Sequence, residues 1–345
     1  MHEIKVLGFS LRKRRLLASF LPEAVLKPID DAQALHAGDT VAVWSSTPAA
    51  ATAADAARRK PGLTVLRVED GFLRSVGLGA QLARPLSWVI DGRGIYYDPS
   101  CPSDLEMMLE RDESDASLIE RARRLRERIV AAGISKYNLG DDRWHGLSSR
   151  RDPERPVILA VGQVEADASV RTGTRAVATN AGLLEAARRH HPEGWLVYRP
   201  HPDVIAGLRR AGSDEVRASA LADEIMPDAP ITRLIDAADA VHVMTSLTGF
   251  EALLRDRAVY CHGLPFYAGW GLTTDAVAIA RRTRLLSLDE LVAATLLRYP
   301  KYVSRATGRP CSAEQALEEL IEWRRCDPER PRWWHALLTP VLRRE

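Results

Sequence analysis

Two carboxylates in one short stretch of the sequence could take part in catalysis. The stretch is Gly-Gln-Val-Glu-Ala-Asp (162–167), and it places Glu165 and Asp167 directly after the apolar run 156–161. A short apolar run of this kind predicts a buried strand, and ligands bind beyond the carboxyl ends of strands in open α/β sheets. A carboxylate placed there can act as a nucleophile or exchange a proton with a substrate. The alternative is that Asp167 only caps the next helical turn.

A second pair of acids, Glu69 and Asp70, has the same relation to a preceding apolar stretch. Residues 64–68 predict a strand, the two carboxylates end it, and Gly71 supplies the permissive backbone of a tight turn. Two acids at a strand end suit a general acid or base at the edge of a cleft. Solvated acids in an ordinary turn would give the same pattern, so this motif alone leaves both interpretations open.

A histidine and an arginine in a restricted loop could hold a phosphate group. His201 lies between Pro200 and Pro202, directly after Arg199 and a strand expected at 195–198. Proline fixes its own φ angle and restricts the residue before it, so this loop can hold an imidazole and a guanidinium toward an anion. An ordinary loop histidine is an equally good interpretation of the stretch by itself.

Hydroxyl side chains gather before another expected helix. Thr245, Ser246 and Thr248 precede Gly249 at the start of a helix expected at 249–255. A helix N-terminus attracts anions through its free N–H groups and its dipole, but Ser246 or Thr248 could equally serve as a plain cap. The sequence has no P-loop motif and no G-x-G-x-x-G motif after its first expected strand, which argues against a P-loop NTPase and a dinucleotide enzyme.

Alternating strand and helix signals along the chain predict an α/β protein. The polar stretch 138–155 divides this pattern in two. We therefore expect two Rossmann-like domains facing a cleft, at residues 1–155 and 156–330, with a last helix within 331–345. The expected strands are 4–9, 40–44, 64–68, 85–91, 94–98, 157–161, 195–198, 240–244 and 258–262. The expected helices are 12–20, 49–59, 115–132, 181–191, 232–238, 249–255, 288–297, 313–324 and 332–342.

The composition is that of an ordinary globular protein. The 345 residues are 46% hydrophobic and 27% charged, and the formal net charge of +2 provides no overall basic field for nucleic acid. The four cysteines form no C-x-x-C pair and show no zinc-type spacing, so we expect reduced thiols in a cytosolic protein. The N-terminus lacks the features of a signal peptide, and no stretch approaches the length of a membrane span.

Taken together, these stretches resemble the KpsC family of capsule β-Kdo transferases. The matching stretches follow one another along nearly the whole chain: Glu-Asp-Gly-Phe-Leu-Arg-Ser-Val-Gly-Leu-Gly (69–79), Pro-Leu-Ser (85–87), Gly-Ile-Tyr-Tyr-Asp (94–98), Lys-Tyr-Asn-Leu-Gly (136–140), Gly-Gln-Val-Glu-Ala-Asp-Ala-Ser (162–169), Arg-Pro-His-Pro-Asp (199–203), Thr-Ser-Leu-Thr-Gly-Phe-Glu-Ala-Leu (245–253) and Pro-Phe-Tyr-Ala-Gly-Trp-Gly-Leu-Thr (265–273). The resemblance implies a retaining transferase of the GT-B type, with two Rossmann-like domains. Such an enzyme takes Kdo from CMP-β-Kdo and leaves it β-linked on a glycan or glycolipid acceptor.

The same resemblance implies a role for each candidate residue. Asp167, with Glu165 as the alternative, would attack the anomeric carbon and form a glycosyl-enzyme. Glu69, with Asp70 as the alternative, would take the proton from the acceptor hydroxyl. The donor would be held by Gln163, Arg199, His201, Pro202, Thr245, Ser246, Thr248 and Gly249. Because CMP is a good leaving group, the scheme needs no cofactor and no metal.

Two other functions stay open at this point. One is a different GT-B transferase with a CMP- or CDP-activated donor, such as a sialyltransferase-like enzyme or a glycerophosphate transferase. The other is a non-catalytic partner in capsule assembly. Members of the family commonly carry two transferase modules in one chain, and this sequence has room for one. Whether it adds a single Kdo or builds an oligosaccharide is therefore also open.

Cations and indole rings alternate near the C-terminus. Trp333 and Trp334 follow Arg332, and Arg343 lies further along the same expected helix. Tryptophan and arginine suit the headgroup level of a membrane, and a basic amphipathic helix can lie in that plane. The alternative is a helix that crosses back onto the first domain and buries Trp333. We therefore expect a cytoplasmic protein, with any membrane contact peripheral and on the inner membrane.

Overall fold

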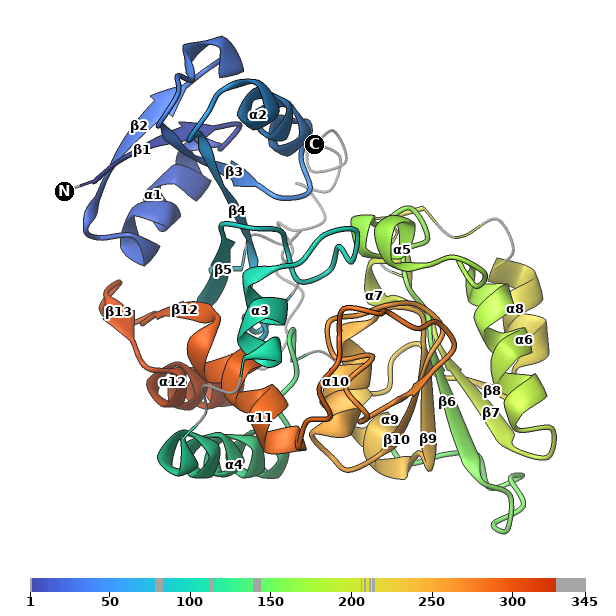
Figure 1. The fold of residues 1–345 in the computed structure, drawn as a ribbon. Helices are drawn as coiled ribbons and strands as arrows, with labels where there is room; N and C mark the ends of the chain where they lie inside the picture. The colour runs from blue at the N-terminus through green and yellow to red at the C-terminus, as the bar shows by residue number, and fades with distance from the viewer. Residues whose placement is uncertain are drawn as a thin grey trace.

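The computed structural model has two lobes, each built around one sheet (Figure 1). It describes residues 2–326 apart from 78–82, 112–114, 139–143, 206, 208, 211, 213 and 214. The first lobe contains the seven-stranded sheet, in the order β13-β12-β5-β4-β3-β1-β2, and the second lobe contains the six-stranded sheet, in the order β11-β10-β9-β6-β7-β8. The expected α/β fold with two sheets is confirmed.

The element bounds agree closely with the apolar and capping patterns of the sequence. The strands are β1 His2–Leu7, β2 Ala24–Ile29, β3 Thr40–Trp44, β4 Thr64–Asp70, β5 Ser87–Asp91, β6 Val157–Val161, β7 Trp195–Arg199, β8 Glu224–Ile225, β9 Ala240–Val243, β10 Ala258–Cys261, β11 Thr274–Asp275, β12 Pro300–Val303 and β13 Pro310–Cys311. The helices are α1 Leu11–Phe20, α2 Pro48–Arg59, α3 Asp104–Glu110, α4 Ala116–Ala131, α5 Ala168–Gly173, α6 Asn180–His190, α7 Pro202–Ile205, α8 Glu215–Leu221, α9 Ile231–Ala237, α10 Leu247–Leu253, α11 Leu288–Val292 and α12 Ala313–Cys326. A 3₁₀ turn (η1) covers Ala32–Ala34, and a π-helix (η3) covers Ala293–Arg298 directly after α11.

The second sheet is parallel throughout and forms the framework for one side of the site. Every residue of its central strand β6 is buried, as expected for a parallel sheet covered by helices on both faces. The apolar side chains of β6 divide between two core clusters, because successive side chains point to opposite faces of a strand. The carboxyl ends of β6, β7 and β9 therefore meet at one edge of the sheet.

The first sheet combines parallel strands with an antiparallel end. β2, β1, β3 and β4 are parallel, whereas β5, β12 and β13 continue the sheet in antiparallel pairs. Strand β2 is absent from the sequence-based list because none of its residues is fully buried and it contains Lys27 and Pro28. A lysine and a proline are tolerated there because β2 is an edge strand.

The last described part of the chain returns to the first lobe. Strand β12 pairs with β5, with Pro300 opposite Val89, and α12 lies beside α4 through ion pairs such as Arg121–Glu314 at 2.6 Å. In Figure 1 these orange and red segments lie below the blue part of the same lobe. The division of the chain at 155 and 330 stays a prediction, but β12 and β13 belong to the first sheet.

Two further expectations concern single segments. The expected strand at 94–98 is wrong, because Asp91 Oδ1 accepts hydrogen bonds from the N–H groups of Arg93 and Gly94, at 2.9 and 2.8 Å, and bends the chain there. The expected helix at 332–342, with Trp333 and Trp334, lies outside the described residues. Of the described helices, none combines the length and the apolar character that crossing a membrane requires.

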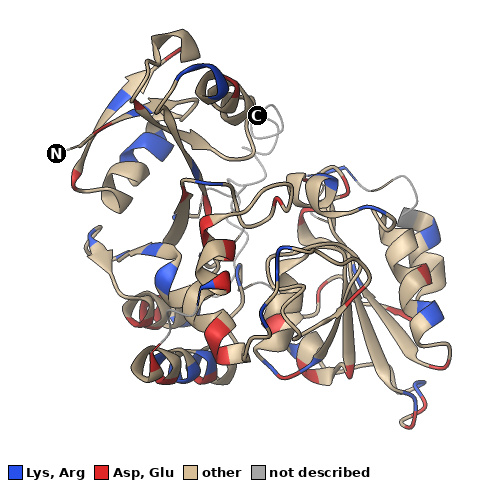
Figure 2. Cartoon of the chain, viewed as in Figure 1, with Lys and Arg blue, Asp and Glu red and all other residues tan. Residues whose placement is uncertain are grey.

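The two lobes share one packed interface. Phe72 of the first lobe contacts Phe266 of the second, with ring centroids 5.0 Å apart, and both belong to the largest apolar cluster. Beside it, buried Glu106 in the first turn of α3 forms an ion pair with buried Arg282 at 3.0 Å. Figure 2 shows lysine and arginine interspersed with aspartate and glutamate along both lobes. The interface thus sets the position of one lobe against the other next to the site.

Candidate active site between the lobes

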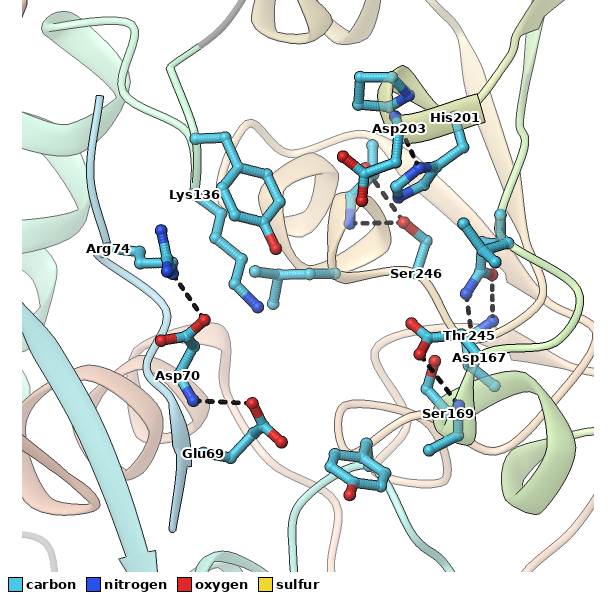
Figure 3. Close-up of a pocket in the computed structure, with 18 of the residues that line it drawn as sticks. Glu69, Asp70, Arg74, Lys136, Asp167, Ser169, His201, Asp203, Thr245 and Ser246 are labelled. Carbon is cyan, nitrogen blue, oxygen red and sulfur yellow. Dashed lines mark hydrogen bonds and ion pairs between the residues drawn. The ribbon is translucent and has the colours of Figure 1, made fainter. Parts of the chain in front are cut away.

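The strand ends of both lobes open onto one cavity of about 900 Å³. The first lobe contributes the end of β4 and the segments around 96–97 and 135–137, and the second lobe contributes the loops after β6, β7 and β9. Figure 3 shows side chains from both lobes pointing into this space. Ten of the twelve residues named as candidates line it: Glu69, Asp70, Gln163, Asp167, Arg199, His201, Pro202, Thr245, Ser246 and Thr248.

Glu69 is a half-buried acid whose proton is held unusually tightly. It lies near the end of β4, where Oε1 accepts a hydrogen bond from the Asp70 N–H at 3.1 Å. Burial, and then the neighbouring charge of Asp70, raise the pKa of Glu69 to about 7, although Lys136 and Lys13 act in the opposite direction. A pKa near 7 lets one carboxyl group both accept and return a proton at neutral pH.

The carboxylate of Asp70 is already engaged. Its Oδ2 accepts a hydrogen bond from Arg74 Nε at 2.6 Å, and its Oδ1 accepts one from Trp88 Nε1 at 3.2 Å. These two donors fix the side chain in one orientation. Asp70 therefore acts on the site mainly through its charge, which favours Glu69 as the acid that meets a substrate.

Asp167 both caps a helix and lines the cavity, the two alternatives that the sequence left open. It is the N-cap of α5, and its Oδ1 accepts the N–H of Ala168 at 3.0 Å. It is also exposed and lines the cavity, and Figure 3 shows its carboxylate on the side opposite Glu69. Glu165 is different, because its Oε1 accepts the N–H of Asn180 at the start of α6, at 2.8 Å, and it does not line the cavity.

Gln163 ties together two of the loops that form the site. Its side-chain Nε2 donates to Thr245 Oγ1 at 3.0 Å, and its Oε1 accepts the N–H of Thr245 at 2.8 Å. Its own N–H donates to Asn180 Oδ1 at 2.9 Å. The amide thus holds the loop after β9 against the loop after β6. This contact gives Gln163 a positioning role in the structure.

Arg199 and His201 hold defined orientations on the second-lobe side. Buried Arg199 donates from Nε to the Ala229 carbonyl at 3.2 Å, and burial lowers its pKa. His201 Nδ1 accepts the N–H of Asp203 at 3.1 Å, so neutral His201 carries its proton on Nε2. Burial lowers the pKa of His201, partly offset by the carboxylates of Asp203 and Asp167. The imidazole is therefore a neutral hydrogen-bond donor toward a ligand.

One of the hydroxyls at the start of α10 is used for capping. Ser246 is the N-cap of this helix, and its Oγ accepts the N–H of Thr248 at 3.2 Å. Gly249, like Glu165, does not line the cavity. A Cβ on Gly249 would overlap the ring of Tyr267, whose hydroxyl donates to the Ser246 carbonyl. The absence of a side chain at Gly249 is thus required by packing, and its expected contact with the donor stays untested.

Sequence reasoning missed several residues that line the cavity. They include Lys136 and Tyr137 from the first lobe, and Asp203 and Glu251 from the second. Lys136 lies within a stretch that carried the family resemblance, but an isolated lysine gives no chemical signal. Its significance depends on neighbours that the fold brings together, so spacing alone could not reveal it. Among the residues that the structure describes, no three His, Cys, Asp or Glu side chains are arranged to hold a metal ion.

Known proteins with similar sequences are surface-polysaccharide proteins. The sequence matches the family model described as "Capsule polysaccharide biosynthesis protein" over residues 39–302. Capsule polysaccharide modification protein LipA of Neisseria meningitidis serogroup B is 40% identical over 326 residues, covering 92% of this chain and 45% of that protein. Lipopolysaccharide-processing protein LpsZ of Rhizobium meliloti is 44% identical over 265 residues, covering 76% of this chain and 59% of that protein. The chain thus spans about half the length of these relatives.

Two solved structures match nearly the whole chain. The beta Kdo 2,7 transferase of Thermosulfurimonas dismutans KpsC has a TM-score of 0.76 and 36% identity, and the match covers 94% of this chain and 100% of that chain. The beta Kdo 2,4 transferase of the same KpsC has a TM-score of 0.79 and 33% identity, and the match covers 93% and 99%. The chain is therefore a KpsC-type member of the capsule polysaccharide biosynthesis protein family.

Proposed function

We propose that this chain is a retaining β-Kdo glycosyltransferase that transfers Kdo from CMP-β-Kdo to a glycan or glycolipid acceptor in the biosynthesis of capsule or surface polysaccharide. The observation that carries the proposal is one cavity with Glu69 and Asp167 on opposite sides and His201 beside them. The two Kdo transferases with similar structures support the choice of sugar. The two lobes facing a cavity support a GT-B-like arrangement, in which the second lobe would hold the donor and the first lobe the acceptor.

Retention of configuration requires two displacements at the anomeric carbon. In the first, a carboxylate oxygen of Asp167 forms a bond to that carbon, and the bond to the CMP phosphate breaks. The leaving phosphate takes the electron pair and is stabilised by the Nε2–H of His201 and by Arg199. The product of this step is a glycosyl-enzyme ester.

In the second displacement, the acceptor hydroxyl attacks the same carbon from the face opposite its bond to Asp167. Glu69 takes the hydroxyl proton as the new bond forms, and the bond to Asp167 breaks. A carboxyl whose pKa is about 7 suits this step, because a useful fraction is ionised at neutral pH. In a donor-bound structure we expect the carboxyls of Glu69 and Asp167 about 5 Å apart, as in retaining glycosidases.

Incubation with CMP-Kdo and a panel of acceptors tests the function directly. We expect CMP release that depends on an acceptor, and a β-linked product by NMR. Parallel reactions with CMP-sialate and CDP-glycerol test the other donor classes, and a preference for either one would contradict the proposal. Absence of CMP release from CMP-Kdo with every acceptor would support a non-catalytic role in capsule assembly instead.

The place of the reaction is a separate part of the proposal. A glycolipid acceptor requires the enzyme at the inner leaflet, and the cationic and indole side chains around Trp333 and Trp334 suit such a contact. Co-sedimentation of the full chain with anionic liposomes at low and high salt tests it. If no protein sediments at low salt, the acceptor is soluble or reaches a cytoplasmic enzyme through a partner.

A further inference from the structure

Lys136 places a cation in the cavity that the proposed mechanism does not yet use. Its side chain is half-buried and points into the space between Asp70 and Ser246 (Figure 3). Within the described parts of the chain, no carboxylate forms an ion pair with its ammonium group. The ammonium instead lies 5.4 Å from the centroid of the Tyr137 ring.

The backbone that carries Lys136 is fixed from both lobes. The Lys136 N–H donates to Glu251 Oε1 of α10, at 2.8 Å. Next to it, Asn138 Oδ1 accepts the Ser135 N–H, and Asn138 Nδ2 donates to the Ser75 carbonyl, both at 3.0 Å. Asn138 has a φ of +53°, a conformation that its side-chain contacts support. The lysine therefore starts from a rigid loop and projects in a defined direction.

The charges around Lys136 leave room for an anion. The carboxylate of Asp70 is already held by its 2.6 Å ion pair with Arg74, and the raised pKa of Glu69, about 7, leaves that carboxyl only partly ionised at neutral pH. Burial opposes the charged form of Lys136, but Tyr137, Tyr96, Asp70 and Glu69 favour it strongly enough to raise its pKa. A cation that stays charged without an ion-pair partner of its own is suited to bind an anionic ligand.

The donor sugar of the proposed reaction has two anionic groups. The nucleotide phosphate has its own candidate ligands on the second lobe, Arg199 and His201. The second group is the carboxylate bonded directly to the anomeric carbon of an ulosonic acid. Lys136 projects from the first lobe, on the side of the cavity that carries Glu69. It therefore faces the part of a bound donor at which the acceptor must arrive.

We propose that Lys136 is the binding site for the carboxylate on the anomeric carbon of an ulosonic acid donor. This inference rests on the proposed function and specifies how the site selects its sugar. The contact orients the anomeric carbon between Asp167 and Glu69. An aldose donor has hydrogen in place of that carboxylate and leaves the half-buried cation without a partner, so the site selects against it.

Binding measurements with and without the carboxylate test the assignment. The parent protein is the Asp167→Asn variant, which prevents turnover during titration calorimetry. Added to it, Lys136→Gln should weaken CMP-Kdo binding about 10- to 100-fold, the range expected for a charge-assisted hydrogen bond. Binding of CMP, which has no carboxylate, should change less than about twofold. Lys136→Arg keeps the charge and should recover part of the lost affinity for CMP-Kdo.

The controls separate the possible failures. Lys301→Gln changes an exposed lysine on β12 that does not line the cavity, and should leave both affinities unchanged. Equal weakening of CMP and CMP-Kdo would assign Lys136 to the phosphate, and unchanged binding of both would remove it from donor recognition. Either result overturns the inference but keeps the proposed function. A parent protein that binds neither ligand refutes the proposed function itself, and the inference with it.

Discussion

Replacement of Glu69 by glutamine should reduce transfer strongly and also stabilise the protein at alkaline pH. Burial and the charge of Asp70 raise the pKa of Glu69 from 4.5 to about 7. In the unfolded chain the carboxyl ionises near 4.5, so between these values only the folded state keeps the proton. Stability therefore falls as the pH rises through this window. At 1.36 kcal/mol per pKa unit, the wild-type protein loses about 3 kcal/mol of stability by pH 7 to 8.

Glutamine has no charge to bury, so the variant does not lose this stability. Urea unfolding followed by tryptophan fluorescence at pH 5 and pH 8 measures the effect. Relative to wild type, Glu69→Gln should gain about 2–3 kcal/mol more at pH 8 than at pH 5. Its transfer rate at pH 7 should fall about 10²–10⁴-fold, the usual contribution of a general acid or base. Glu23→Gln alters an exposed carboxyl and should change neither quantity.

The two measurements refute different parts of the reasoning. A stability difference that is the same at both pH values would show that Glu69 does not bury its charge as the structure indicates. A transfer rate close to wild type would remove Glu69 from the chemistry, whatever its pKa. If Asp70→Asn loses more activity than Glu69→Gln, the role of acid and base belongs to Asp70.

Three further predictions rest on particular contacts in the structure. Asp167→Asn should abolish transfer with little change in melting temperature, because asparagine keeps the cap of α5; near-normal turnover would rule out double displacement. In the plot of transfer rate against pH, Asp70→Asn should move the transition that reports Glu69 to lower pH, because the charge of Asp70 is one cause of the raised pKa of Glu69. A shift of this transition to higher pH would contradict the explanation. His242 and His262 lie 3.0 Å apart, Nδ1 to Nε2, and burial lowers their pKa values to about 2 and about 4. As the pH falls below about 6.5, these histidines bind protons in the unfolded state but not in the folded state. Each histidine should therefore lower the free energy of unfolding by about 1.4 kcal/mol per pH unit, down to pH 4. His242→Gln should lower the slope measured in urea titrations by about 1.4 kcal/mol per pH unit, and an unchanged slope would refute the assignment.

The central strands were predictable because their signals are local. The run 157–161 is apolar at every position, and it forms β6 with all five residues buried. The segments that could not be predicted depend on partners distant in the sequence. Strand β12 exists through its pairing with β5, and residues 94–98 lose their strand character through the side chain of Asp91. Neither partner can be identified from the stretch itself.

The same distinction applies to the site. Glu69, Asp167 and His201 follow apolar runs, so a rule about strand ends finds them, and the fold brings them to one cavity. The sequence could not decide between Glu69 and Asp70, because the hydrogen bonds of Asp70 with Arg74 and Trp88 form only in the folded protein. Lys136 was missed for this reason. Its importance comes from the carboxyls and the ring beside it, and no spacing rule describes that arrangement.

The return of the chain to the first sheet has a consequence for how the protein is made. The ribosome releases β1 to β5 early, but the partner of β5 is one of the last strands to emerge. Until then β5 is an open edge, able to pair with another chain. The strands of the second sheet lie within one continuous segment and are released before that point. During synthesis the first sheet therefore stays incomplete while the second sheet assembles. A chain that ends before Pro300 would keep the edge of β5 unpaired and should be prone to aggregate.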